Sequence, residues 1–455
     1  MRESAARVES RALNDIAKQS EPFDALDRMT SAELDAWWAR RLSAIYKVAA
    51  RELPFYRERF AAAGFDATRF RSLADLKKVP ITRKSDLLAA QRRIGSNAIG
   101  IERVSEPSKD HVTLSLSSGT SGTTFVTHNR RWRRMQGLSS SRGHWWAGLR
   151  PGGPLLMSAP AWHSYASIQP NVAMHFEMPC VIISGTYLPR FADRIVDAIQ
   201  RFRPRFVTMF LPMVFSILAE ARRQGLGEEL FAGIESMVVT GAPITPGMRM
   251  HLQKLTKIPR IAEIAGSSEN LLAVDCPFDR GLHLVFDTCH AEVLDRQTNE
   301  PVADNVRGAM VHSMVIPYGS IYLRYDGGDV GYIDHAPCPC GVPSPRIKLL
   351  GRAEDEFTLG SQAMLPYDVQ LALETEVPEL GGATCVITRE GLAAGMLRLL
   401  LIESESSSAT LVSAAREKLV HRFGVQVEIA PVRDLPLRFK GVPPILSERE
   451  ASAPS

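Results

Sequence analysis

The stretch Ser117-Ser118-Gly119-Thr120-Ser121-Gly122-Thr123-Thr124 consists only of hydroxyl residues and glycine, and an apolar, strand-like segment precedes it. Glycine lets backbone N–H groups approach a phosphate closely, and serine and threonine hydroxyls add further donors. A loop of this composition suits a triphosphate, although a polar surface loop could look the same. The stretch does not match the Gly-x-x-x-x-Gly-Lys-Ser/Thr pattern, which disfavours an ordinary P-loop NTPase.

The bulk composition is that of an ordinary soluble globular protein, with 45% hydrophobic and 23% charged residues in 455. Its length predicts about two to four domains or one large multilayer domain. The formal net charge of +4 is small, which disfavours a nucleic-acid-binding protein. Without a run of about 18 uncharged apolar residues, no membrane span is expected. The N-terminus lacks a signal-peptide core and cysteines are sparse, so we expect a cytoplasmic protein with reduced thiols or metal-bound cysteines.

Hydrophobic periodicity divides the chain into an α/β pattern and a second, smaller region. Residues 1–90 carry apolar side chains at helical spacing and predict a helical N-terminal region. Residues 110–350 alternate short apolar runs with amphipathic segments, which predicts α/β layers with largely parallel sheets. A polar break at residues 351–355 precedes a second α/β region over residues 356–430.

Two turns in the α/β pattern end in carboxylates. Ala265-Gly266-Ser267-Ser268-Glu269 is one of them, and carboxylate and phosphate oxygens are the ligands that Mg²⁺ prefers. A glutamate at this point could equally begin a helix, where the dipole favours it. In the second turn, Gly327-Gly328-Asp329, the carboxylate suits ribose hydroxyls. The preceding Asp-Gly pair is also a common hairpin signal.

Two charged motifs follow. Arg352 comes after a glycine and could meet ribose or phosphate, while Glu354 and Asp355 could act at a hinge. Lys440 lies in Arg438-Phe439-Lys440-Gly441, within a turn-rich tail where a lone lysine is usually only solvated. Each motif is weak alone, so the order of the motifs along the chain carries the interpretation.

Taken in order, these motifs resemble the adenylate-forming superfamily of acyl- and aryl-CoA synthetases, and most nearly its phenylacetate–CoA ligase branch. The resemblance runs from about Leu53 to the C-terminal tail and includes Pro80-Ile81-Thr82-Arg83-Lys84-Ser85-Asp86-Leu87, similar to the branch's Pro-x-Thr-x-Lys-x-Asp-Leu segment. It implies an α/β fold with a large multilayer N-terminal adenylation domain, residues 1–351, whose sheets are flanked by helices. A hinge at residues 352–355 and a small mobile α+β C-terminal lid, residues 356–455, would follow.

The resemblance also implies roles for individual residues. Glu269 would bind Mg²⁺, and Lys440 would be the catalytic lysine that stabilises the charge developing during adenylation. Glu354 or Asp355 would mark the hinge. The residues assigned to ATP are Ser117, Ser118, Gly119, Thr120, Ser121, Gly122 and Thr123 for the β- and γ-phosphates, Gly241, Ala242 and Pro243 for adenine, Ser268 for the α-phosphate, and Asp329 and Arg352 for ribose.

The sequence departs from the branch in two places. Thr123 stands where the phosphate loop usually has lysine or arginine, so one phosphate-binding cation is missing. Phe439 precedes Lys440 where the tail usually has glycine. The loop therefore supports the use of ATP more strongly than it supports ordinary ligation to coenzyme A.

Four residues offer metal-ligating side chains: Cys276, His283, Cys338 and Cys340. A tetrahedral Cys₃His set is ordinary for structural Zn²⁺, and by resemblance some members of the branch carry zinc at matching positions. The spacing between the two halves is long, so unrelated thiols are an alternative, and Cys289 and His290 compete for one position.

The acyl substrate would lie near a loop with three aromatic rings, Trp162, His163 and Tyr165, which follows a predicted buried strand. By resemblance this loop borders the carboxylate pocket, to which Gly266 is also assigned. Aromatic side chains there suit a planar ring. Plain packing residues would give the same pattern.

The sequence thus predicts an AMP-forming ligase of the acid–thiol type. We expect ATP and Mg²⁺ to activate a carboxylate, expected to be aromatic, as an acyl-adenylate that forms a thioester with coenzyme A or an acyl-carrier protein. One alternative activates another oxyanion, such as nitrite for diazotisation of an arylamine in natural-product biosynthesis. A second is a non-catalytic nucleotide-binding homologue. The acid, the acceptor and the oligomeric state stay open, with a homodimer as one expectation.

Overall fold

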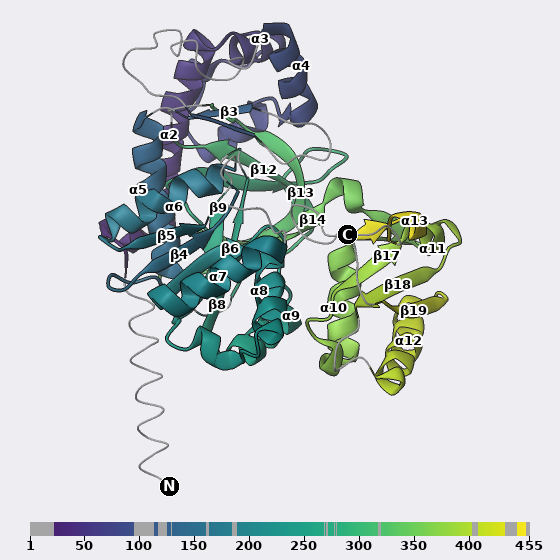
Figure 1. Ribbon diagram of the computed structural model, residues 1–455. Helices are drawn as coiled ribbons and strands as arrows, with labels where there is room; N and C mark the ends of the chain where they lie inside the picture. The colour runs from purple at the N-terminus through teal and green to yellow at the C-terminus, as the bar shows by residue number, and fades with distance from the viewer. Residues whose placement is uncertain are drawn as a thin grey trace. The chain divides into compact units, whose positions relative to one another are not determined.

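Figure 1 draws the computed structural model of the chain. The chain divides into two compact units. The first unit draws on Met1–Ser184, Ala262–Gly327 and Gly331–Lys348, and the second on Gly185–Ile261, Gly328–Val330 and Leu349–Ser455. Among the described helices, none combines the length and hydropathy needed to cross a bilayer. The structure describes residues 22–94, 113–116, 125–128, 130–160, 163–183, 189–267, 269, 272–276, 278, 280–316, 320–402, 408–432 and 444–451.

The first unit begins with helices that bury one face. Helix α2 (Ser31–Glu52) starts at a capping box formed by Thr30 and Glu33. Proline at the first position of α3 (Pro54–Ala62) suits a helix start, because its missing N–H would have no helical partner there. Helix α4 (Lys84–Ile94) follows. The buried residues of α2 include Leu34, Trp38, Leu42, Ile45 and Ala49, at the helical spacing that the sequence predicts.

A mainly antiparallel sheet forms the centre of the first unit, with the strand order β11-β12-β13-β14-β10-β9-β8. Strand pairs β11–β12, β10–β14, β9–β10 and β8–β9 are antiparallel. Three of these pairs join consecutive strands, which can return beside each other without a crossover helix. The predominance of parallel pairing that the sequence analysis predicts is therefore absent from these pairs. The strands are β8 (Arg260–Gly266), β9 (Leu272–Asp275), β10 (Leu282–Leu284), β11 (Cys289–Leu294), β12 (Gly308–Met314), β13 (Tyr325–Asp334) and β14 (Arg346–Arg352).

Three smaller pairings complete the first unit. Strand β1 (Thr82–Arg83) runs parallel to β13, and β2 (Thr113–Leu116) is antiparallel to β3 (Phe125–His128). Strands β4 (Leu155–Ser158) and β5 (Cys180–Ile183) are parallel and joined through α6 (Ser164–His175). Helix α5 (Arg130–Trp146) precedes β4 and packs against β9 so closely that a Cβ at Gly143 would lie 2.7 Å from a methyl carbon of Val274.

The second unit contains the parallel pairing that the sequence predicts. Strands β6 (Phe206–Phe210) and β7 (Ser236–Thr240) are parallel and buried along their whole length. A near-continuous apolar run is expected of strands that are covered on both faces. The helices of this part are α7 (Pro189–Phe202), α8 (Leu211–Arg223) and α9 (Pro246–Thr256).

The C-terminal segment of the second unit builds a small sheet with the order β19-β18-β17-β20. Figure 1 shows β17, β18 and β19 side by side, with α12 next to β19. Its hydrophobic core combines Val369, Leu373, Leu399, Leu419 and Val427. The segment consists of the hairpin β15 (Phe357–Leu359) and β16 (Gln362–Met364), then α10 (Pro366–Glu376), β17 (Cys385–Thr388), α11 (Arg389–Ala393), β18 (Leu397–Ile402), α12 (Ala409–Phe423), β19 (Val427–Val432), β20 (Ile445–Leu446) and α13 (Glu448–Ala451). Together with the large sheet and its helices, this segment confirms the predicted α/β class, while the boundaries at residues 352–355 stay a prediction.

Within the second unit, Glu374 of α10 contacts the first turn of α9. Its carboxylate is 7% exposed. It accepts hydrogen bonds from the Thr245 hydroxyl at 2.5 Å and from the Gly247 backbone N–H at 3.0 Å. The positive end of the helix dipole favours a carboxylate at this position. A Cβ at Gly247 would lie 2.5 Å from a Glu374 oxygen, so a side chain there would displace the Glu374 carboxylate.

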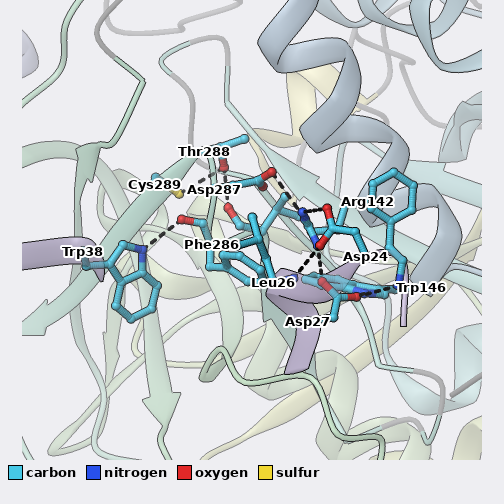
Figure 2. A network of polar contacts seen from close by, with 12 residues as sticks. Asp24, Leu26, Asp27, Trp38, Arg142, Trp146, Phe286, Asp287, Thr288 and Cys289 are labelled. Atoms are coloured by element: carbon cyan, nitrogen blue, oxygen red, sulfur yellow. Dashed lines mark hydrogen bonds and ion pairs between the residues drawn. The ribbon is translucent and has the colours of Figure 1, made fainter. Parts of the chain in front are cut away.

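A buried arginine holds the segment before α2 within the first unit (Figure 2). Arg142 is 1% exposed and forms ion pairs with Asp24 at 2.7 Å, with Asp287 at 3.3 Å and with Asp27. The Trp146 indole also donates to Asp27, at 2.9 Å. The three carboxylates come from two separate stretches of the chain, so the guanidinium ties the segment preceding α2 to the turn before β11.

Candidate active site

The predicted phosphate loop, Ser117–Thr124, lies outside the described residues, as do Ser268, Lys440 and Trp162. The strands that flank the loop are described. Strand β2 ends at Leu116, which pairs with Phe125 at the start of β3. The described residues on either side of the predicted loop are therefore adjacent across an antiparallel strand pair.

The predicted adenine segment, Gly241-Ala242-Pro243, follows the carboxyl end of β7 in the second unit. Ligands of parallel α/β sheets bind beyond the carboxyl ends of the strands. Gly241 has a φ of +102°, and a Cβ there would lie 2.7 Å from a ring carbon of Phe210. Glycine is thus required at this position both by the backbone conformation and by the close approach of the aromatic ring.

The two predicted ribose residues meet in the second unit. The Arg352 guanidinium, in β14, lies 2.7 Å from the Asp329 carboxylate, in β13. The side chains are half-buried, with 31% and 19% exposed. Gly328 has a φ of +87°, and a Cβ there would lie 3.5 Å from a guanidinium nitrogen. The ion pair therefore orients a carboxylate that remains accessible to a ligand with hydroxyl groups.

Glu269, the predicted Mg²⁺ ligand, follows β8 in the first unit and is 7% exposed. Its backbone carbonyl oxygen lies 2.8 Å from Nε2 of His312. Gly266, which the sequence analysis assigns to the substrate pocket, is the last residue of β8 and pairs with Leu272. Strands β8 and β9 thus bracket the short turn that carries the carboxylate.

The predicted hinge residues form a short 3-10 helix, Ala353–Asp355, directly after β14. Burial and the neighbouring Glu354 carboxylate raise the pKa of Asp355. Their role as a hinge stays a prediction.

His163 and Tyr165, predicted to line the substrate pocket, lie at the start of α6. Nδ1 of His163 accepts a hydrogen bond from the Tyr165 backbone N–H at 3.2 Å, so the imidazole caps the helix. The Tyr165 side chain is 9% exposed. These contacts give His163 a local structural role, and contact with substrate stays a prediction for both residues.

The four predicted zinc ligands converge in the first unit. The ligand atoms of Cys276, His283, Cys338 and Cys340 all lie within 4.8 Å of one another. The Cys276 and Cys338 sulfurs are 3.4 Å apart, and the Cys340 sulfur is 3.1 Å from Nε2 of His283. Tetrahedral Zn²⁺ with bonds of 2.0–2.3 Å places its ligand atoms about 3.3–3.8 Å apart.

The surroundings of the cluster also suit a metal. Nδ1 of His283 lies 2.9 Å from the Ser344 carbonyl oxygen, to which it donates, and this tautomer leaves Nε2 free to ligate. A hydrogen bond from Cys340 lowers the pKa of the Cys276 thiol, which favours the thiolate that metals bind. The competing pair lies elsewhere: Thr288 donates to Cys289, and His290 packs edge-on against Trp38. The donor set therefore fits a tetrahedral zinc ion.

Three contacts of the structure have no counterpart among the sequence motifs: His312 with Glu269, Glu374 with α9, and Arg142 with its carboxylates. His312 stands within strand β12 and Arg142 within helix α5, and neither belongs to a motif of the sequence analysis. The signal that could have marked them is a charged or polar residue at a position whose helical or strand spacing predicts burial.

Comparisons with known proteins identify the family of the chain. A family model described as AMP-binding enzyme matches residues 39–314. The phenylacetate-coenzyme A ligase of Thermus thermophilus is 28% identical over 382 residues, which cover 80% of this chain and 81% of that protein. The phenylacetate-coenzyme A ligase of Escherichia coli is 22% identical over 415 residues, covering 88% and 89%.

Solved structures show the same fold. A 2-hydroxyisobutyryl-CoA ligase in complex with 2-HIB-AMP has a TM-score of 0.79 at 21% identity, with 94% of each chain covered. An anthranilate CoA ligase in complex with anthranoyl-AMP has a TM-score of 0.54 at 16% identity, covering 72% of this chain and 64% of that one.

Proposed function

The chain belongs to the AMP-binding enzyme family, as an AMP-forming ligase of the phenylacetate–CoA ligase-like branch, and we propose that it joins an aromatic carboxylic acid to the thiol of coenzyme A. In the first step, a carboxylate oxygen attacks the α-phosphorus of ATP and pyrophosphate leaves. In the second step, the thiolate attacks the acyl carbon of the acyl-adenylate and AMP leaves. The atoms balance, with ATP supplying the leaving groups for both steps.

The Asp329–Arg352 ion pair is the observation that carries this proposal. Arg352 holds the Asp329 carboxylate at 2.7 Å, so that carboxylate is oriented to accept hydrogen bonds from both ribose hydroxyls. The loop at Gly241 belongs to the same unit and offers a closely packed backbone for the adenine ring. A carboxylate held in place before the ligand arrives loses less freedom on binding than a mobile one.

We propose that residues of the sequence motifs bind the phosphate groups of the nucleotide. We assign the β- and γ-phosphates to Ser117–Thr123 and the α-phosphate to Ser268. Glu269 would hold Mg²⁺, which would neutralise the charge on the phosphate oxygens. Lys440 would donate to the oxygens on which charge develops in adenylation. Because Thr123 offers no cation, we assign a larger share of this stabilisation to Lys440.

The preference for an aromatic acid is supported by the relatives that act on phenylacetate and anthranilate, as their names state, and by the aromatic Tyr165 after β4. We place the acyl ring beside His163, Tyr165 and Gly266. The domain movement implied by the resemblance belongs to the same proposal: a lid of residues 356–455 would turn about residues 352–355 between the two steps.

Zinc enters as a structural group. The ion would be bound by Cys276, His283, Cys338 and Cys340. It would link the end of β9 and strand β10 to the segment before β14. Its four positions are filled by protein ligands, which is the pattern of structural rather than catalytic zinc sites.

The test is ATP–pyrophosphate exchange measured across a panel of aryl and alkyl acids, followed by product analysis. We expect exchange with an aromatic acid, and consumption of the acyl-adenylate when coenzyme A is added. A Lys440→Ala variant should lose exchange, while the matched Lys257→Ala variant, altered at an exposed lysine that pairs with Glu228, should retain it.

Three outcomes of the same assay would contradict the proposal in different ways. If a thioester formed only on a phosphopantetheinylated carrier protein, the acceptor would be that protein and not coenzyme A. If AMP release depended on nitrite and an arylamine, the activated substrate would be nitrite and not a carboxylic acid. Nucleotide binding without any turnover would make the chain a non-catalytic homologue.

A further inference from the structure

His312 is a buried imidazole in contact with the segment that carries Glu269. It lies within β12, and its side chain is 3% exposed. Nε2 lies 2.8 Å from the Glu269 carbonyl oxygen. A carbonyl oxygen can only accept a hydrogen bond, so Nε2 carries the proton and donates. The contact therefore fixes both the orientation and the protonated nitrogen of the ring.

The imidazole is itself held in place. Its backbone is paired in the sheet, where His312 stands opposite Ala291 of β11. The ring meets Tyr325 edge-on, with centroids 5.5 Å apart and planes at 84°. Tyr325 in turn packs against Tyr322 at 5.2 Å, and both tyrosines are 1% exposed. Nε2 thus points at the Glu269 carbonyl from a rigid part of the sheet.

The carbonyl that His312 contacts lies in the chain between β8 and β9, which pair at Gly266 and Leu272. A hydrogen bond to this carbonyl restrains the backbone of Glu269, and with it the direction in which the Glu269 side chain leaves the backbone. Mg²⁺ demands near-ideal octahedral geometry, with ligand distances of about 2.0–2.1 Å. A small displacement of a charged ligand therefore weakens metal binding and slows the reaction.

We propose that His312 is a positioning residue, which orients Glu269 to bind the Mg²⁺ of the ATP complex. The inference rests on the proposed function, because it takes Glu269 as the metal ligand. It adds a residue outside the sequence motifs to the group that determines the use of Mg²⁺. His312 acts through Glu269 and has no role in proton transfer.

The experiment compares one substitution of His312 that keeps an aromatic ring with another that keeps an N–H donor. His312→Phe retains a ring against Tyr325 but removes the N–H. His312→Gln restores an amide N–H at about the reach of Nε2. His290→Phe is the matched control, since His290 is also buried, stands in the adjacent strand β11 and packs against Trp38.

One readout is the Mg²⁺ dependence of ATP–pyrophosphate exchange, with free Mg²⁺ varied at a fixed ATP concentration. The second is the Mg²⁺ dependence of ATP binding without the acid, measured by calorimetry, which should shift in the same direction. For His312→Phe we expect half-saturation at about tenfold higher Mg²⁺ and a roughly tenfold to hundredfold lower exchange rate, with the KM for the acid unchanged. His312→Gln should recover most of both. His290→Phe should match the original chain.

Loss of stability alone would not shift the Mg²⁺ dependence, so an unchanged half-saturation in a folded His312→Phe variant overturns the inference. Should that variant fail to fold, His312→Asn takes its place, because its shorter amide cannot reach the carbonyl. Equal Mg²⁺ dependence of the Asn and Gln variants then overturns the inference, and a higher requirement in the Asn variant supports it. Absence of exchange in the original chain with every acid contradicts the proposed function instead, so the two failures are distinct.

Discussion

Arg352 and Asp329 form an ion pair at 2.7 Å although they stand on different strands and are 23 positions apart. The glycine that precedes Asp329 has a positive φ of +87° and lies against the guanidinium. A side chain at that glycine would be strained by the backbone conformation. The turn and the pair therefore form one preorganised group, and its effect on nucleotide binding can be measured.

Replacement of Asp329 by Asn should weaken ATP binding while leaving the fold intact. The amide keeps the size of the side chain but loses the charge that Arg352 holds and one acceptor for the ribose. Hydrogen bonds to charged groups contribute about 1.5–3 kcal/mol, so we expect the KM for ATP to rise roughly tenfold to hundredfold. ATP–pyrophosphate exchange at varied ATP measures this change.

The control for this prediction is Asp304→Asn, which removes the charge from an exposed ion pair with His335. It should leave the KM for ATP unchanged. An Asp329→Asn enzyme with an unaltered KM for ATP would exclude Asp329 from the ribose site.

The Asp329–Arg352 meeting and the Cys/His cluster could both be predicted from sequence because their residues sit in local patterns of unusual chemistry. The sequence shows an aspartate directly after two glycines, and two cysteines separated by one residue. Both patterns can be recognised without knowledge of distant contacts. The order of these motifs along the chain supports the family resemblance, and the resemblance predicts which residues act together. Local pattern also indicates the strand Leu397–Ile402, since apolar residues fill it almost completely.

The zinc prediction is that the purified chain contains about one equivalent of zinc, bound at the Cys276 cluster. Cys338→Ser should lower the zinc content and the midpoint of thermal unfolding, because a structural zinc links segments that are far apart in sequence. Metal analysis of protein prepared without chelators, together with thermal unfolding before and after chelator treatment, checks both effects.

Cys180→Ser is the matched control, since Cys180 is a half-buried free cysteine of β5 outside the cluster. It should retain the zinc content and the thermal midpoint. Purified protein that contains no zinc and has unchanged stability would contradict the zinc prediction.

The free energy of unfolding should fall as the pH is lowered from about 6.5 toward 4. Burial lowers the pKa of His144 to about 4, against an opposing hydrogen bond with the Ser140 carbonyl, and lowers that of His290 to about 3. The unfolded chain then binds more protons than the folded one, so this stability is fully present above pH 6.5 and is lost on acidification. Each histidine contributes a slope of about 1.4 kcal/mol per pH unit within this window.

Urea unfolding at several pH values measures the slope. His290→Phe should reduce it by about the contribution of one histidine, because phenylalanine keeps the ring against Trp38 but cannot take up a proton. Replacement of the exposed His421 by Gln serves as the control and should leave the slope as it is. A slope identical in the original chain and in His290→Phe would show that His290 does not resist protonation.

Asp27→Asn should destabilise the first unit, because it removes one of the three carboxylates that pair with the buried Arg142. Asp27 is 4% exposed and Arg142 is 1% exposed. Breaking an isolated buried pair on one side costs about 3–5 kcal/mol, and we expect a smaller loss here because Asp24 and Asp287 still pair with the guanidinium. Chemical denaturation should reveal the loss, whereas Asp197→Asn, at an exposed pair with Arg201, should leave the unfolding midpoint unchanged. Equal midpoints for the two variants would contradict the role given to Arg142.

The Arg142 contacts could not be predicted from the sequence, because nothing local marks them. The guanidinium lies 115 residues from Asp27 and 145 residues from Asp287, and neither aspartate stands in a recognisable motif. The same holds for His312, a single polar residue in an otherwise ordinary strand pattern. Long-range contacts between single residues leave no periodic signal, in contrast to turns, caps and ligand clusters.

Gly247 and Glu374 are 127 positions apart, yet each limits what the other can be. Any larger residue at Gly247 would collide with the carboxylate, and a shorter residue at Glu374 would leave the first turn of α9 without its acceptor. Acceptance of a side chain at one position therefore requires a change at the other. Across related chains the two positions should covary, with glycine at the first wherever a long acidic residue stands at the second.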